Sequence, residues 1–271
     1  MEHILDDRER FYSHVVQRLI LERDARILIV GGCKFDRDIF YAAGFTNVTI
    51  TGLDLGAKPE DIFPYKWQRE NATALSFNDG SFEYVVAHAC IHHASKPHQM
   101  LLEMYRVASK GLLAFESRDS VLMRVLAYFN LTQTYEHAAV YFNDSKSGGV
   151  DNTEIPNFVF RWTEREVQKT IQSYNPSYEH RYVYSYGSSA PCTPDLESNA
   201  SFKKLIIFFL KPFYNFFVLI FKKQQNLFSF FVGKPDNYDD PFPWLTFNEL
   251  QDKLVFNKDW GRQKYGKETE L

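Results

Sequence analysis

The sequence predicts an α/β fold with an open, mostly parallel sheet of about seven strands flanked by helices. Three observations predict it. Short β-branched segments alternate with amphipathic helical segments over roughly the first 120 residues. Their spacing is typical of βαβ units. Glycine or polar residues follow directly after several of the apolar segments, which is how buried parallel strands end at a ligand-binding edge.

The first half supplies most of this pattern. Residues 8–23 and 97–109 carry apolar side chains at helical spacing, and Gly111 is expected to end the second of these helices. Residues 36–44 form a shorter helix closed by glycine. The predicted strands are 26–30, 48–53, 67–70, 82–87 and 112–116.

The second half is less regular. Helices are expected at 121–130 and 163–174, and strands at 181–186 and 226–233. Between these strands, residues 202–221 are strongly apolar but interrupted by Lys211-Pro212, so they are too short to span a membrane. We expect a hairpin or broken helix packed over the ligand site. The alternative is an interfacial element with lysines at headgroup level. The tail beyond Pro241 is expected to pack through Trp244, Phe247 and Trp260.

Composition narrows the class of protein. The net charge of −3 and the pI near 6.3 argue against a nucleic-acid-binding protein, which would need a basic surface. The three cysteines include no Cys-x-x-Cys pair, so the sequence suggests neither a disulfide framework nor a metal site. The N-terminal residues are charged and lack an apolar signal segment, which predicts a cytoplasmic protein.

Candidate site residues follow four of the predicted strands. Gly31-Gly32 follow the first strand, where missing side chains let a ligand approach the backbone. Asp54 ends the second strand, in a position to accept hydrogen bonds from ribose hydroxyls. Asn71-Ala72 follow the third strand, and the segment from His88 to His93 follows the fourth. These ends meet at one edge of a parallel sheet, so we expect one ligand site there.

The stretch from Glu70 to Val86 carries a family resemblance. It reads ENATALSFNDGSFEYVV and is followed by Ile91-His92-His93, by Tyr105-Arg106-Val107 and by Gly111. In this order and spacing, residues 25–117 resemble the class I S-adenosylmethionine-dependent methyltransferases that act on small molecules, the type 11-like group. The resemblance implies a Rossmann-like fold and S-adenosylmethionine as cofactor. It also implies one domain over 1–271, with a cofactor-binding core at 25–117, a substrate-facing segment at 118–175 and an apolar insertion at 198–225.

The resemblance also assigns cofactor contacts. Gly31 and Gly32 would lie against the methionine portion, and Asp54 would hold the ribose. The adenine would lie beside Leu55 and contact Asn71 and Ala72. His88 would lie near the sulfonium and the acceptor. Two positions depart from the family pattern: the first loop lacks its usual acid and later glycines, and Asn71 replaces an aspartate.

Histidine is the natural general base near neutral pH if the methyl acceptor is a hydroxyl. The candidate catalytic residues are His92, His93 and His137, with His88 nearby. Each has a structural alternative: the paired histidines could hydrogen-bond backbone in their loop, and His137 could lie at the surface. Glu116, at the end of the fifth strand, could orient substrate or cap a turn.

The predicted function is therefore methyl transfer to a small organic acceptor, preferably at oxygen. A sugar or glycan precursor fits the polar aromatic segment 148–162, and a lipid-linked acceptor fits the apolar segment, with peripheral membrane contact through 202–221. One alternative is a catalytically silent binding or scaffolding protein, motivated by the altered first loop. Another is a nicotinamide-dependent oxidoreductase, which the missing Gly-x-Gly-x-x-Gly argues against. Neither the acceptor nor the oligomeric state follows from the sequence.

Overall fold

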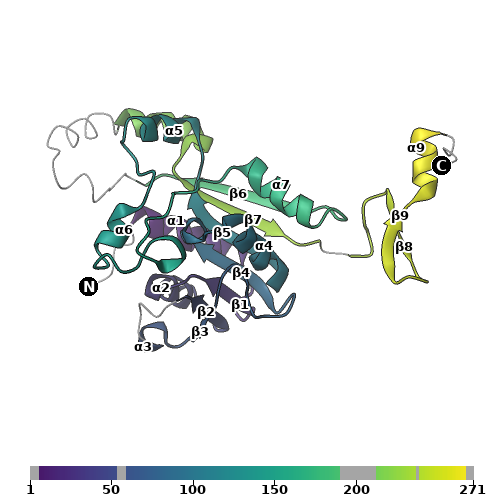
Figure 1. Ribbon diagram of the computed structural model, residues 1–271, viewed down its shortest axis with the longest axis horizontal. Coiled ribbons are helices and arrows are strands. Elements are labelled where there is room, and N and C mark those ends of the chain that lie inside the picture. The colour runs from purple at the N-terminus through teal and green to yellow at the C-terminus, as the bar shows by residue number, and fades with distance from the viewer. Residues whose placement is uncertain (1–5, 54–58, 190–211, 236–237, 267–271) are drawn as a thin grey trace.

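The protein is built around one seven-stranded sheet in the strand order β3-β2-β1-β4-β5-β7-β6 (Figure 1). This computed structural model describes residues 6–53, 59–189, 212–235 and 238–266. Strands β1 to β5 run parallel to one another, whereas β7 is antiparallel to both β5 and β6. The predicted α/β class, with a mostly parallel Rossmann-like sheet flanked by helices, is confirmed.

The sheet strands are β1 (Ile27–Val30), β2 (Val48–Gly52), β3 (Lys66–Arg69), β4 (Phe82–His88), β5 (Ala108–Ser117), β6 (Arg181–Gly187) and β7 (Leu227–Gly233). The α-helices are α1 (Asp7–Leu19), α2 (Lys34–Ala42), α3 (Pro59–Ile62), α4 (Pro97–Val107), α5 (Val121–Tyr128), α6 (His137–Tyr141), α7 (Glu164–Tyr174) and α9 (Lys258–Tyr265). Three 3₁₀ turns, η1 (Ile91–His93), η2 (Val150–Asn152) and η4 (Lys222–Gln224), lie in the connections.

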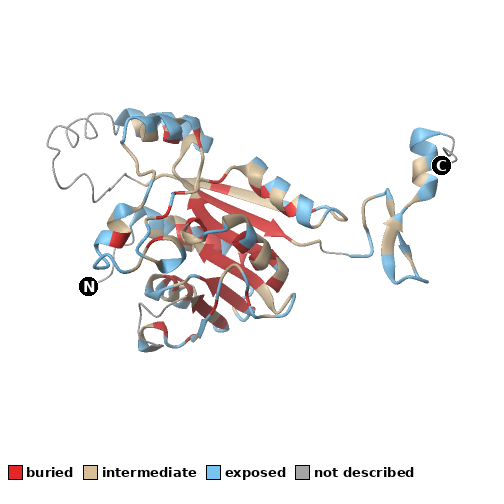
Figure 2. Cartoon of the chain, viewed as in Figure 1, coloured by how far each residue is buried: buried red, intermediate tan, exposed pale blue. Residues whose placement is uncertain are grey.

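Two hydrophobic cores cover the two faces of the sheet (Figure 2). Side chains alternate between faces along a strand, so Ile27 and Ile29 enter one core while Leu28 and Val30 enter the other. Helices α1 and α2 close the first core, and α4 and α7 close the second. Because β1 is buried on both faces, it reads as a continuous apolar run in the sequence.

The boundary between α4 and β5 differs from the prediction. The helix ends at Val107, and β5 begins at Ala108, opposite Phe82 of β4. Gly111 therefore lies inside the strand and does not end the helix. A Cβ at Gly111 would lie 2.7 Å from the Phe231 ring of β7, so close strand packing explains this glycine.

Part of the predicted apolar insertion is visible. Residues 212–220 are helical. The turn after them contacts α5, where the Leu122 backbone N–H donates to Gln224 Oε1 at 3.0 Å. Residues 202–211 lie outside the described residues. Across the described part of the chain, no helix is both long and apolar enough to cross a membrane.

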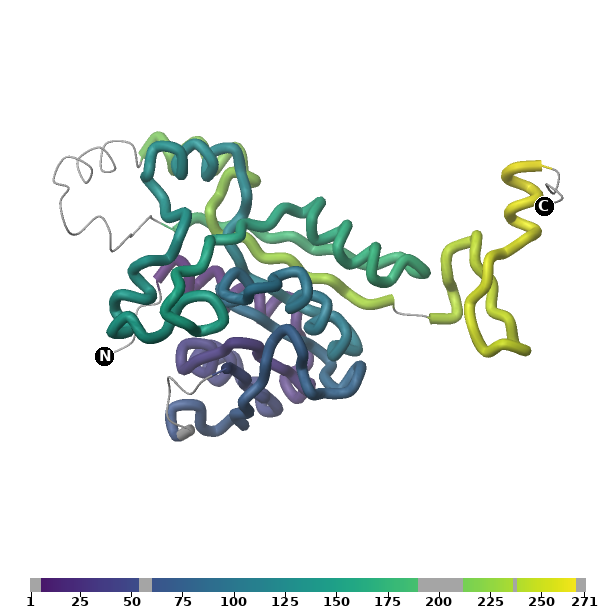
Figure 3. Tube along the Cα trace, in the orientation of Figure 1, coloured from purple at the N-terminus to yellow at the C-terminus, as the bar shows by residue number. Residues whose placement is uncertain are grey.

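The C-terminal segment stands away from the sheet (Figure 3). It consists of a hairpin of β8 (Leu245–Asn248) and β9 (Lys253–Phe256), followed by α9. Trp244 and Trp260 pack against each other as expected, with ring centroids 5.9 Å apart, whereas Phe247 is 54% exposed. A ring contact between Tyr178 and Tyr238 joins this segment to the loop after α7. The domain boundaries stay a prediction.

Candidate active site

A cavity of about 540 Å³ lies at the carboxyl ends of β1, β2, β3 and β4. Five of the sequence-predicted residues line it: Gly31, Gly32, Asn71, Ala72 and His93. The structure thus brings together residues that follow three different strands. The loop after α6 adds further wall from residues 143–152.

The two glycines of the first loop are required by close packing. Gly31 has a φ of +66°, and a Cβ there would lie 2.8 Å from Cys90 Sγ. That thiol is held in place by a 3.0 Å hydrogen bond to the Val30 carbonyl. A Cβ on Gly32 would lie 2.6 Å from the Ile29 side chain. Both glycines also line the cavity, so the altered first loop keeps glycine at two backbone positions that border it.

The turn after β3 holds Asn71 in a defined orientation. Its Oδ1 accepts hydrogen bonds from the Thr73 backbone N–H at 3.0 Å and the Thr73 hydroxyl at 2.9 Å. Since Oδ1 faces this turn, Nδ2 is the atom that remains for a ligand. Glu70, beside it, is buried and accepts from the Ser76 backbone N–H and hydroxyl.

Two predicted cofactor contacts, Asp54 and Leu55, lie outside the described residues. The residues just before them, Gly52 and Leu53, line the cavity. Asp54 and Leu55 therefore directly follow a segment of the cavity wall, and their assignment stays a prediction.

His88 does not line the cavity. As a β4 residue it alternates with Ala87 and projects to the α1 face, where its ring stacks on Tyr12 with centroids 4.2 Å apart. Arg8 Nε donates to His88 Nε2 at 3.2 Å. Burial, with a smaller contribution from the Arg8 charge, lowers the pKa of His88 to about 3, so its imidazole is neutral at physiological pH.

His92 is held by a buried carboxylate. Glu116, at the end of β5, contacts His92 Nδ1 through Oε2 at 2.5 Å and accepts the Ile91 backbone N–H through Oε1 at 2.8 Å. Burial alone would lower the pKa of His92, but Glu116 and then Glu136 outweigh it and raise that pKa to about 10. Of the two roles considered for Glu116, capping a turn agrees with its hydrogen bond from the Ile91 N–H at the start of η1, whereas orientation of the substrate stays a prediction.

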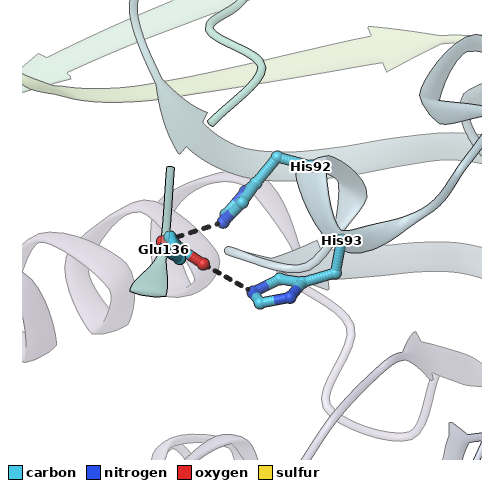
Figure 4. A group of neighbouring side chains, drawn as sticks. All are labelled: His92, His93 and Glu136. Atoms are coloured by element: carbon cyan, nitrogen blue, oxygen red, sulfur yellow. Dashed lines mark ion pairs between the residues drawn. The ribbon is translucent and has the colours of Figure 1, made fainter. Parts of the chain in front are cut away.

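Glu136 joins both histidines (Figure 4). Its Oε1 lies 3.4 Å from His92 Nε2, and its Oε2 lies 3.1 Å from His93 Nε2. We call His92, His93 and Glu136 the histidine–glutamate cluster. Despite the cost of burial, hydrogen bonds from the two imidazoles hold the pKa of Glu136 well below its usual range. His137, the next residue along the chain, is exposed and contacts only Tyr135 among the ring pairs of the described residues.

A loop between α6 and α7 closes over the site. Asp151 Oδ1 accepts the Ser95 backbone N–H at 3.0 Å, which ties the loop to the segment after η1. A Cβ on Gly149 would collide with the Ile155 carbonyl, so the loop depends on this glycine. Farther on, Asn157 Nδ2 donates to Glu136 Oε2 at 3.2 Å. The segment that the sequence marked as substrate-facing thus supports the histidine–glutamate cluster.

Comparison with known proteins identifies a domain within this chain. Residues 32–115 match a family model described as a methyltransferase domain. This region carries a methyltransferase domain. The prediction of an S-adenosylmethionine-dependent methyltransferase is confirmed by this match, which contains Asn71 and the paired histidines. No curated protein matches the chain.

Solved structures of similar fold are distant in sequence. A chain of a Haloferax volcanii complex containing the Trm112 methyltransferase activator is 11% identical, with a TM-score of 0.51, covering 86% of this chain and 92% of that one. Magnesium protoporphyrin IX methyltransferase from Synechocystis PCC 6803, solved with bound SAH, is 9% identical with a TM-score of 0.50, covering 84% and 83%. At these identities the likeness shows the methyltransferase fold alone.

Proposed function

We propose that the protein transfers a methyl group from S-adenosylmethionine to an oxygen of a small organic acceptor. The observation that carries this proposal is the single cavity that joins Gly31, Gly32 and Asn71 to His93. Its volume of about 540 Å³ lies within the range of small-molecule and cofactor sites. The cofactor fits the strand-end loops, and the histidine–glutamate cluster fits the acceptor end.

The cofactor roles follow the family resemblance. Gly31 and Gly32 would receive the methionine portion, because no side chain separates it from the backbone there. Asn71 Nδ2 and Ala72 would contact the adenine. Asp54 would accept hydrogen bonds from the ribose hydroxyls, with Leu55 beside the base.

The reaction is an in-line displacement at the sulfonium methyl group. The carbon–sulfur bond breaks as the carbon–oxygen bond forms, which gives the methylated acceptor and S-adenosylhomocysteine. The protein contributes alignment of the two reactants within the cavity and exclusion of water from between them. The acceptor hydroxyl loses its proton at the histidine–glutamate cluster, where His93 lines the cavity and Glu136 orients it.

Polar side chains of the covering loop favour a hydroxyl-rich acceptor. Asn143, Ser147 and Asn152 line the cavity and offer both donors and acceptors of hydrogen bonds. A sugar or glycan precursor would use them, and this supports the acceptor class predicted from the sequence.

The experiment is methyl transfer from methyl-labelled S-adenosylmethionine to a panel of sugars and other hydroxyl compounds. His93→Ala is expected to lower kcat at least 100-fold, because positioned proton transfer contributes about 10²–10⁴-fold. The matched control is His14→Ala, since His14 is an exposed residue of α1. Equal kcat values for His93→Ala and the wild type would exclude the proposed role of the cluster.

The helix at 212–220 supports a lipid-linked acceptor and peripheral membrane contact. Phe213, Phe216 and Leu219 are between 66 and 75% exposed, and Lys222 and Lys223 follow the helix. Apolar side chains flanked by lysines are typical of interfacial helices. Phe213→Ser with Phe216→Ser should therefore reduce co-sedimentation with anionic vesicles several-fold. Leu250→Ser, which changes a 98% exposed residue of the C-terminal hairpin, should leave it unchanged, and equal losses would reject the contact.

A further inference from the structure

The histidine–glutamate cluster has the composition and spacing of a metal site. Two imidazole nitrogens and one carboxylate, from His92, His93 and Glu136, all lie within 4.8 Å of one another. The two carboxylate–imidazole distances are 3.4 and 3.1 Å. Tetrahedral zinc, with bonds of about 2.0–2.1 Å, places neighbouring ligand atoms roughly 3.3 Å apart. The two carboxylate–imidazole distances, each to a different oxygen of Glu136, are already close to that separation, and one ligand atom from each of the three residues lies within 4.8 Å of the others.

Surrounding groups orient these side chains as supporting residues do in metal sites. Glu116 holds His92 Nδ1 at 2.5 Å, which leaves Nε2 directed at Glu136. A carboxylate on the far nitrogen of a histidine ligand is the usual arrangement around bound metal. Glu116 itself is fixed by the Ile91 backbone N–H. His92 is therefore presented through one nitrogen only.

A buried polar atom beside the cluster is unsatisfied. Asn157 is 2% exposed and donates through Nδ2 to Glu136, but its Oδ1 accepts no hydrogen bond from any described residue. Buried amide oxygens are seldom left without a partner. A bound ligand or water molecule beside Asn157 would supply the missing donor.

We propose that His92, His93 and Glu136 bind one divalent transition-metal ion of the zinc type. Two imidazoles and one carboxylate are ligands that zinc accepts, and three protein ligands leave a coordination position open. Because His93 also lines the cavity, an ion held by these residues would lie at the edge of the space assigned to the acceptor. This role rests on the proposed function: with metal bound, the ion would replace His93 as the group that activates the acceptor hydroxyl, by binding that hydroxyl, lowering its pKa and letting its proton leave to solvent before methyl transfer.

The full chain, freed of metal with a chelator, is titrated with zinc by calorimetry and with cobalt by visible absorption. We expect one ion per chain with submicromolar affinity, and tetrahedral cobalt bands. Glu136→Gln and His93→Asn should each weaken zinc binding at least 100-fold. Glu116→Gln should weaken it by about 10–100-fold as a positioning residue. His14→Ala should match the wild type.

Thermal unfolding curves verify that each variant is folded before titration. If Glu136→Gln does not fold, His93→Asn alone tests the ligand set, because its position is partly exposed. Failure of the folded wild type to bind zinc, or unchanged affinity in both ligand variants, would overturn the metal site. Titration with S-adenosylhomocysteine in parallel separates the two proposals. Cofactor binding without metal binding rejects only the metal site, whereas metal binding without cofactor binding rejects only the methyltransferase role.

Discussion

Gly31→Ala is expected to weaken S-adenosylhomocysteine binding at least tenfold and to lower the free energy of unfolding by about 2–4 kcal/mol. A non-glycine residue in the left-handed region costs roughly 1–2 kcal/mol. The new Cβ would also lie 2.8 Å from Cys90 Sγ and 2.9 Å from its Cβ, and overpacking costs about 1–3 kcal/mol. Because Gly31 and Cys90 both line the cavity, relief of this contact must deform the cofactor wall.

Gly44→Ala is the matched control for this effect. Gly44 also has a positive φ, of +82°, but a Cβ there would meet nothing within 4 Å. It should therefore show only the conformational cost, and cofactor affinity should stay unchanged. The free energies of unfolding of both variants are compared by urea denaturation. Equal destabilisation by the two substitutions would show that contact with Cys90 has no effect.

Glu116→Leu is expected to lower the free energy of unfolding by about 3–5 kcal/mol, which is typical when one partner of a buried ion pair is removed. The substitution leaves the buried His92 imidazole and the Ile91 backbone N–H without their acceptor. Urea denaturation of chelator-treated protein measures the effect without any contribution from bound metal.

The double variant Glu116→Leu with His92→Leu separates pairing from packing. Removing both partners should cost less than the sum of the two single substitutions, with a coupling of about 1–3 kcal/mol. Additive losses would mean that the short contact between Glu116 and His92 contributes no pairing energy.

Much of the fold could be predicted because local patterns coincide with buried strands. Segments such as 26–30 combine an apolar run with a glycine stop, and the structure has β1 there. The prediction of the α4–β5 boundary was wrong because, in the sequence alone, Gly111 resembles a residue that ends a helix. Its actual role depends on Phe231, more than a hundred residues away in the chain, which no local pattern reveals.

The candidate site was predictable only where strand ends determine it. Gly31 and Asn71 reach the cavity because parallel strands end at one edge. Glu136 was not predicted as a site residue, although its neighbour His137 was. Glu136 belongs to the site only because the folded chain brings it to His92 and His93, and no sequence pattern reveals that contact. His88 is the last residue of β4, the strand that precedes His92 and His93, yet side-chain alternation directs it to Tyr12 instead.

Calorimetric titration of the full chain with S-adenosylmethionine and S-adenosylhomocysteine tests the central claim most directly, with NADH as control. We expect one site of micromolar affinity for both S-adenosylmethionine and S-adenosylhomocysteine, none for NADH, and at least tenfold weaker binding in Gly31→Ala. Asp54→Ala should weaken binding as well if its carboxylate holds the ribose. Folded wild-type protein that binds neither compound would contradict the account and favour a silent binding protein, and preference for NADH would favour an oxidoreductase.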